Sequence, residues 1–389
     1  MKEAIEYDLI LINFNFREVN QYPCIAKHLS KRYRVGFIDV PGEMLSIKMA
    51  KTKSKLEKTN QIVTTLISEL GADVLDPRGR YRCRLMLLPQ SCWMEKKLPV
   101  KVDFDICCAL ERFGSGPLGT KELSKMGVSE LWIYDYKLYT AIAGTVLHYK
   151  GDKEKLPAIE MGTPYKKYPA LDFSDLNIDY LLAYPTSMLL KSGELQFGFY
   201  KNIDKVIGKI DYHKIISKQH NVRDQDNRKE KLKNKKIYQN IIDKAPRLAW
   251  EGLIKFSEIF KLRGLRHSAY QRQKSMLENT IKKKTVDLES LTQYGSLGIE
   301  HFLPFIRKGV ITGISSCIWH ALYDNIPVYN CDTRVSINGL PNEKALSVFH
   351  ILPCNGELRF DRSAFEFISE SSRKADIINL IEERLLTNK

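Results

Sequence analysis

The sequence predicts an α/β protein of two domains, each built on a mostly parallel sheet with helices on both faces. Three observations support this prediction. The chain has 389 residues, too many for one ordinary hydrophobic core. Short apolar runs alternate with longer segments of helical periodicity. Hydrophobic residues make up 43% and charged residues 28% of the chain, proportions typical of a globular protein and not of a disordered or fibrous one.

The first predicted domain, residues 1–165, opens with a strand–helix–strand unit. Its predicted strands are residues 7–13, 33–39, 72–75, 83–88, 102–109 and 130–134, and its predicted helices are 21–31, 48–70, 121–126 and 137–142. Strands joined through helices return to the same end of a sheet, so we expect them to pair in parallel.

The second predicted domain, residues 166–389, follows a stretch rich in Gly, Pro and polar residues at 148–180 that interrupts the periodicity. Its predicted strands are residues 180–184, 214–217, 309–312 and 326–329; its predicted helices lie within 229–284, at 317–323 and as a pair within 363–386. We expect the last helix pair to pack back across the domain junction. Ligands of open α/β sheets bind at the carboxyl ends of the strands, so two such domains predict a cleft between them.

Several classes of protein are disfavoured by composition. No apolar run approaches the roughly 18 residues that cross a bilayer, and the first residues resemble a strand and not a signal peptide. The eight cysteines form neither a CxxC pair nor a zinc-spaced cluster with histidine, which argues against a disulfide framework and a structural metal. We therefore expect a cytoplasmic protein with reduced, mostly buried cysteines.

The positive charge is concentrated in one segment. Residues 201–285 contain 23 Lys and Arg against 9 Asp and Glu, a net +14 of the +15 carried by the whole chain. Such a segment suits an anionic partner, namely the cytoplasmic membrane face, a polyanionic glycan or nucleic acid. A solvated surface without a ligand is the alternative interpretation.

Two sets of hydroxyl side chains are predicted to meet a phosphate group. Ser315 and Ser316 fall between a predicted strand and helix, where unpaired N–H groups and the helix dipole favour an anion; an ordinary Ser cap is the alternative. Thr186 and Ser187 occupy the turn after the first strand of the second domain. Upstream of the serines, Glu300 is a candidate to accept a hydrogen bond from a nucleoside ribose, or it is simply an acid at a helix start.

A second polar motif, Lys218-Gln219-His220, follows a predicted strand directly. His220 can donate to a phosphate oxygen and Lys218 can add a point charge. A loop histidine bonded to the backbone is the alternative.

Carboxylates of the first domain are the candidates for a general base. Asp103 and Asp105 lie on a predicted strand, and Glu111 precedes a glycine-rich turn that contains Gly114, Ser115 and Gly116. Such a turn lets the backbone approach a ligand closely, and a carboxylate at its entrance can deprotonate an acceptor hydroxyl. A Gly/Pro loop beside a solvated acid is the alternative.

Together these motifs resemble the two-domain GT-B glycosyltransferases, and more narrowly the bacterial sialyltransferases and polysialyltransferases that use a CMP-activated sugar. The resemblance lies in the acid–Gly motif at 111–116, the Lys-x-His motif at 218–220 and the Ser-Ser turn at 315–316. Asn221 stands where the family has proline, and Arg112-Phe113 interrupts the acid–Gly pattern, so Asp103 and Asp105 stay as alternative bases.

The resemblance implies two Rossmann-like domains facing a cleft and an inverting transferase that needs no metal. It implies Glu111 as the base, His220 as a phosphate ligand that stabilises the leaving CMP, and Ser315 and Ser316 as further phosphate ligands. The acceptor would be a capsule or lipooligosaccharide glycan, with the basic segment resting on the inner face of the cytoplasmic membrane or guiding an anionic glycan.

Other functions stay open on the sequence alone. CDP-glycerol-type polymer transferases, Kdo transferases and UDP-sugar-dependent GT-B enzymes share the phosphate-binding features. A sugar-nucleotide epimerase would need extra carboxylates around the sugar. A non-catalytic nucleic-acid-binding protein would use the basic segment, which lacks a recognisable binding signature, so we expect no nucleic acid as partner.

Overall fold

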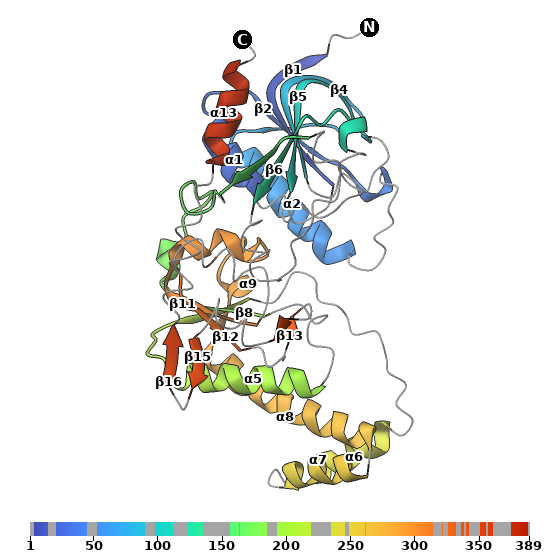
Figure 1. Cartoon of the computed structure of the whole chain (residues 1–389), viewed down its shortest axis with the longest axis vertical. Helices are drawn as coiled ribbons and strands as arrows, with labels where there is room; N and C mark the ends of the chain where they lie inside the picture. The colour runs from blue at the N-terminus through green and yellow to red at the C-terminus, as the bar shows by residue number, and fades with distance from the viewer. Residues whose placement is uncertain are drawn as a thin grey trace.

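The computed structural model describes residues 4–14, 21–44, 53–89, 98–111, 123–134, 156–162, 164–184, 193–218, 235–245, 249–260, 262–313, 321, 326–331, 336–337, 340–341, 351–354, 357–360 and 375–387. They form an α/β structure with one seven-stranded and one five-stranded sheet, and all strand pairs in both sheets are parallel. The predicted α/β class with two parallel sheets is confirmed. In Figure 1 the first sheet lies above the second, and helices α5 to α8, within residues 193–284, lie below the second sheet.

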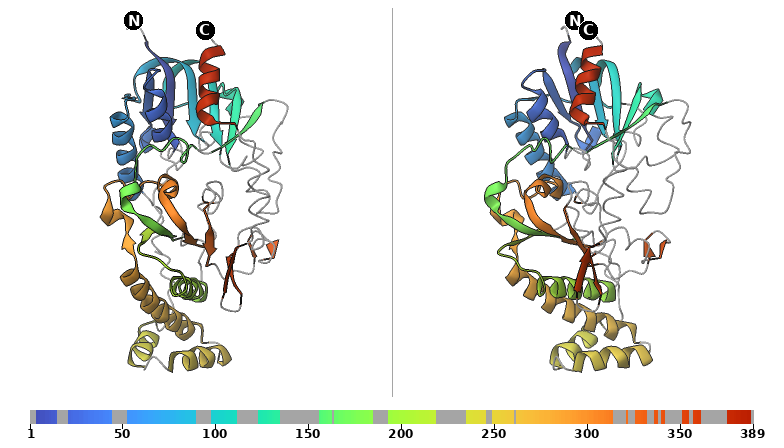
Figure 2. Two further views of the ribbon diagram at one scale, coloured as in Figure 1. Left: turned by 90° about the vertical axis from the view of Figure 1, so that its left-hand side faces the viewer. Right: turned by 60° about the vertical axis from the view of Figure 1, so that its left-hand side comes forward.

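The first sheet has the strand order β3-β2-β1-β4-β5-β6-β7. Its strands are β1 (Ile5–Asn13), β2 (Val35–Asp39), β3 (Asp73–Val74), β4 (Arg80–Pro89), β5 (Lys101–Glu111), β6 (Glu130–Tyr134) and β7 (Ala158–Met161). The order changes direction between β1 and β4, which makes this pair the topological switch point of the sheet. Figure 2 shows the strands running from the end that carries both termini toward the second domain.

Apolar side chains on both faces explain why these strands pair in parallel inside the protein. In β1, Leu9 and Leu11 belong to one buried cluster, whereas Ile10 and Ile12 belong to another. Alternate residues of a strand point to opposite faces, so this run needs cover on both sides. Two helices supply cover on the Leu9 face, α1 (Tyr22–Leu29) and α2 (Lys53–Glu69).

The last helix, α13 (Ile377–Thr387), also covers the first sheet, beside α1 in Figure 1. Its Arg384 Nε donates to Glu130 Oε1 at 2.9 Å, and its Glu382 pairs with Arg32 of the loop after α1. Just before it, Ala375 bridges in parallel to Met161 of β7. The chain therefore returns to the first sheet, and residues 375–387 of the predicted second domain pack on the first.

The second sheet has the order β10-β9-β8-β11-β12. Its strands are β8 (Ile178–Ala183), β9 (Ile215–Lys218), β10 (Val286–Asp287), β11 (Ile306–Thr312) and β12 (Val328–Asn330). One face packs on α5 (Gly193–Ile207) through Phe199 and Ile203. On the other face, Leu181 and Val310 join the same buried cluster as Leu9 and α13. One apolar core thus continues through both domains.

Polar contacts reinforce the junction of the two domains. Tyr294 Oη, in the loop after α9 (Leu288–Leu291), donates to Glu69 Oε2 at 3.1 Å, and Lys27 Nζ donates to the carbonyl of Pro169 at 2.9 Å. Two short antiparallel hairpins lie outside the sheets: β13 (Ser336–Ile337) with β14 (Leu340–Pro341), and β15 (Ile351–Cys354) with β16 (Glu357–Phe360).

Three helices form an extension that we call the helical arm: α6 (Lys235–Lys244), α7 (Trp250–Ile259) and α8 (Arg263–Lys284). They pack around a small cluster of their own that includes Ile242, Ile254 and Leu265. The arm lies at the end of the molecule opposite the termini (Figures 1 and 2). No helix within the described ranges is both long and apolar enough to cross a membrane.

Candidate functional site

The carboxyl ends of three neighbouring strands in the second sheet lie in one row. Lys218 of β9 pairs with Ala183 of β8, and Ala183 pairs with Thr312 of β11. The hydroxyl of Thr312 donates to the carbonyl of Ala183 at 2.8 Å, which ties β11 to β8 at their ends. Since the strand order changes direction between β8 and β11, this row is the switch-point edge where open α/β sheets bind ligands.

The predicted phosphate-binding motifs follow these three strands directly. Thr186 and Ser187 come after β8, His220 comes after β9, and Ser315 and Ser316 come after β11. The five residues lie outside the described residues, but each is within four residues of the row Lys218–Ala183–Thr312. The fold therefore brings the attachment points of all three motifs to one edge, although the motifs are about 30 to 130 positions apart in sequence.

Lys218 has a different environment from the one expected for a simple ligand of a phosphate. Its side chain is buried, and its Nζ donates to the backbone carbonyl of Gly295. An ammonium group is costly to bury unless it has partners, so this contact commits at least one of its three donors to the protein. The geometry favours a positioning role in which Lys218 holds the loop after α9 against the end of β9.

Glu300, the ribose-binding candidate, belongs to that same loop. It lies in a 3₁₀ turn, Ile299–His301, and both it and His301 are buried. The His301 ring packs edge-on against Tyr165, with 5.3 Å between ring centroids. Ser296, five residues after the helix, is also buried, and its Oγ has no hydrogen-bond partner in the described part of the chain. The loop thus contains three buried polar side chains, and it contacts Lys218 through the carbonyl of Gly295.

Gly295 makes this loop possible, because a side chain there would meet the backbone of α9. A Cβ atom at Gly295 would lie 2.6 Å from both the Leu288 carbonyl oxygen and Glu289 Cα. We expect Gly295→Ala to lower the free energy of unfolding by about 1–3 kcal/mol, measured by urea denaturation, because backbone atoms must shift to admit the methyl group.

The matched control is Gly252→Ala on α7, where a new Cβ would meet no atom within 4 Å. We expect that variant to be more stable by about 0.5–1 kcal/mol, since alanine favours a helix over glycine. Equal stability of the Gly295 variant and the unmodified protein would contradict the close packing of this loop.

The base candidates of the first domain are separated along one strand. Glu111 is the last residue of β5, at the carboxyl edge. Asp105 and Asp103 precede it by six and eight residues, or about 20 and 26 Å of extended strand. Both are exposed, and Asp105 accepts from Arg82 at 3.1 Å. The fold places Glu111 at the predicted edge and the two aspartates in the opposite half of the sheet; Gly114, Ser115 and Gly116 lie outside the described residues.

A polar pair at the same edge was missed by the sequence analysis. Asn13 ends β1 and Asp39 ends β2; the two residues are paired in register, and Asn13 Nδ2 donates to Asp39 Oδ1 at 2.6 Å. Burial raises the pKa of Asp39 to about 6, against the opposing effect of the bond from Asn13. This carboxyl group can therefore exchange a proton near neutral pH.

Three buried amide atoms of Asn13 and Gln21 have no hydrogen-bond partner among the described residues, which lowers the stability of the native state. They are Asn13 Oδ1 and both amide atoms of Gln21. Gln21 precedes α1, whose Tyr22 hydroxyl donates to the carbonyl of Ile12 at 2.9 Å, so the helix starts over the end of β1. Unpaired buried amides cost about 1–3 kcal/mol each, and such costs concentrate at functional sites.

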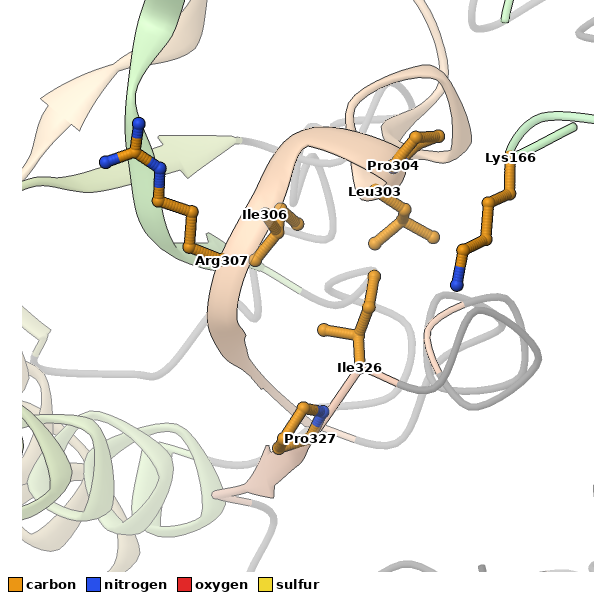
Figure 3. A pocket seen from close by; sticks show the side chains of 7 residues that line it. All are labelled: Lys166, Leu303, Pro304, Ile306, Arg307, Ile326 and Pro327. Atoms are coloured by element: carbon orange, nitrogen blue, oxygen red, sulfur yellow. The ribbon is translucent and has the colours of Figure 1, made fainter. Parts of the chain in front are cut away.

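A pocket among the described residues lies elsewhere. It opens at the amino ends of β11 and β12, opposite the predicted phosphate edge, and Figure 3 shows Lys166 and Arg307 on different sides of its apolar lining. Its lining residues are Lys166, Leu303, Pro304, Ile306, Arg307, Ile326 and Pro327. Arg307 already donates to Asn177 Oδ1. This pocket brings together none of the predicted site residues.

No metal-ligating group of three or more His, Cys, Asp or Glu occurs in the part of the chain that the structure describes. Cys24, Cys83, Cys107, Cys108 and Cys331 are buried free cysteines. A scan against protein-family models and a search of curated proteins each found no match to this chain.

Proposed function

We propose that the chain is an inverting glycosyltransferase of the GT-B type, which transfers sialic acid or a similar acidic sugar from a CMP-activated donor to a cell-surface glycan. The observation that carries this proposal is the convergence of three motif-bearing strands, β8, β9 and β11, on one switch-point edge. Each of these strands is followed in the sequence by a candidate phosphate donor, and ligands of open α/β sheets bind at this edge.

The chemistry of the proposed reaction is a direct displacement at the anomeric carbon. The acceptor oxygen forms the new bond while the bond from carbon to the donor phosphate breaks, and CMP leaves with the bonding electrons. His220 and the hydroxyls of Ser315 and Ser316 would stabilise the charge on the leaving phosphate. Lys218 would hold the adjacent loop, and Glu300 would be positioned by that loop. No metal ion is part of this proposal.

Two carboxylates of the first sheet are candidates to accept the proton of the acceptor hydroxyl. Glu111 is supported by its place at the end of β5 and by its sequence motif. Asp39 is supported by burial, by its bond to Asn13 and by a pKa close to physiological pH, which suits a general base. The ends of β2 and β5 are three strand spacings apart, about 14 Å, so one hydroxyl cannot contact both.

A thermal-shift screen tests the donor site. The full-length protein is heated with CMP, CDP, UDP, GDP and their sugar conjugates, because a ligand that binds only the folded state raises the melting temperature. We expect CMP and CMP-sialic acid to stabilise the protein most, by about 2.7 kcal/mol at a concentration 100 times Kd. Selective stabilisation by CDP or UDP would overturn the CMP donor in favour of the CDP-glycerol-type or UDP-sugar alternative, and no response to any nucleotide would reject the phosphate site.

The type of reaction is tested separately. Nucleotide released only when an oligosaccharide acceptor is present would support transfer. Interconversion of the sugar without an acceptor would indicate an epimerase. Binding to an oligonucleotide that persists at about 200 mM salt would favour the nucleic-acid alternative, since purely electrostatic binding weakens steeply with salt.

A further inference from the structure

Helix α7 of the helical arm has apolar side chains on two faces, of which one has no cover. Trp250 and Ile254 are buried, and Ile254 packs with Ile242 of α6 and Leu265 of α8. On the other face Phe256, Ile259 and Phe260 are 48%, 74% and 60% exposed. Residues three and four positions apart lie together on a helix surface. These three side chains therefore form one patch, which we call the tip patch.

The tip patch differs from ordinary scattered surface residues. The Phe256 and Phe260 rings pack against each other with 4.5 Å between centroids. Ile241 of the neighbouring helix α6 is also 43% exposed, so the arm holds four of the eight large apolar side chains that are exposed within the described residues. Single exposed apolar residues are common, whereas a cluster of aromatic and aliphatic side chains usually marks an interaction site.

The tip patch lies in the basic segment of the chain. Lys244 and Lys255 are exposed on α6 and α7, and the segment 201–285 that contains the whole arm carries a net charge of +14. The exposed acids beside them are Asp243 on α6 and Glu251 and Glu258 on α7, so the positive charge is a property of the whole segment. Such a combination suits a partner that presents negative charge outside and an apolar layer just beneath it. An anionic bilayer has this layered arrangement.

We propose that the tip of the helical arm docks on an anionic lipid bilayer, with Phe256, Ile259 and Phe260 inserted at the headgroup boundary and the surrounding lysines on lipid phosphates. A nucleic acid would use the lysines but leave the aliphatic and aromatic side chains in water. A second copy of the arm would cover the apolar patch but bring two strongly positive segments together. The proposal concerns only this surface, and it does not depend on the identity of the transferred sugar.

The test is co-sedimentation of the full-length protein with vesicles. One set of vesicles contains phosphatidylcholine alone, and the other contains phosphatidylcholine with about 30% phosphatidylglycerol, an anionic lipid. We expect binding to the anionic vesicles only. The combined substitution of Phe256, Ile259 and Phe260 to Ser should lower the partition coefficient at least about tenfold, because most of the inserted apolar area is lost. Lys244→Gln with Lys255→Gln should weaken binding and reduce its dependence on salt.

The matched control replaces Ile5, Val74 and Leu386 with Ser; these side chains are 49%, 47% and 55% exposed but belong to the first domain and α13, away from the arm. We expect it to bind vesicles as the unmodified protein does. Circular dichroism and melting temperature establish that each variant is folded.

Equal binding by the tip variant and the unmodified protein, or no binding by either, would overturn the proposal. Self-association in the absence of vesicles that disappears in the tip variant would assign the patch to a second copy instead. The same variants are also tested for thermal shifts with nucleotides. Because the tip patch lies outside the phosphate edge, we expect these shifts to be unchanged, so a failure of membrane binding does not count against the proposed transferase.

Discussion

Asp39→Asn is expected to raise the free energy of unfolding and to lower strongly the rate of the proposed sugar transfer. The native state raises the pKa of Asp39 from 3.8 to about 6 through burial. The folded protein therefore holds this proton more tightly than the unfolded chain, so stability falls as pH rises between about 4 and 6. Two pKa units correspond to about 2.7 kcal/mol. Above pH 7 the uncharged variant should be more stable by about 2–3 kcal/mol, and at pH 4 the difference should vanish.

Activity should change in the opposite direction if Asp39 accepts the acceptor proton. Loss of a general base typically lowers the rate by about 10²–10⁴-fold. The dependence of kcat/KM on pH in the unmodified protein should rise with an apparent pKa near 6, and that limb should be missing in the variant. Denaturant unfolding at pH 4 and pH 7.5, together with nucleotide release in the presence of an active glycan acceptor, measures both effects.

Comparison with Glu111→Gln assigns the base. A large loss in the Glu111 variant and full activity in the Asp39 variant would make the Asn13–Asp39 pair a structural feature only. Glu111 ends β5 and Asp39 ends β2, at the same carboxyl edge of the first sheet. Each variant therefore changes one side chain of this edge and leaves the other in place. A stability gain without any loss of activity would leave the electrostatic account of Asp39 correct and remove its proposed role in catalysis.

The strands of both sheets were predictable because buried parallel strands are short, continuous apolar runs. The predicted strand 130–134 coincides with β6, and the predicted strands 180–184, 214–217 and 309–312 overlap β8, β9 and β11. Strand β7 was missed because Gly, Pro and charged residues flank its four positions in a stretch interpreted as a boundary. Its pairing with β6 is a tertiary contact that local periodicity does not contain.

Partners distant in sequence account for most of what the sequence analysis left out. The predicted return of the last helices across the domain junction is confirmed for α13, but its partner Glu130 could not be predicted from local sequence. Lys218 was interpreted as a charge for a ligand, and nothing local indicates a bond to Gly295, 77 positions later. The Asn13–Asp39 pair had one usable signal: two strands that pair in register both end in a polar residue able to hydrogen-bond.

His220→Ala is expected to lower turnover by about 10²–10³-fold, the usual cost of removing one donor that stabilises developing charge. His220 follows the last residue of β9, Lys218, by two positions and is not one of the buried strand residues that form the core. We therefore expect an unchanged melting temperature without ligand and a smaller thermal shift with CMP. The matched control is His267→Ala on α8 of the helical arm, which should alter neither quantity.

The double variant Ser315→Ala/Ser316→Ala tests whether His220 and the two serines act on the same phosphate group. If they share a site with His220, the triple variant should lose less activity than the product of the separate losses, because residues that stabilise the same charge are not additive. Independent, multiplicative losses would mean that the histidine and the serines act on different groups. Turnover that is unchanged in His220→Ala would remove the histidine from the mechanism, and the proposed phosphate edge would then rest on the serines alone.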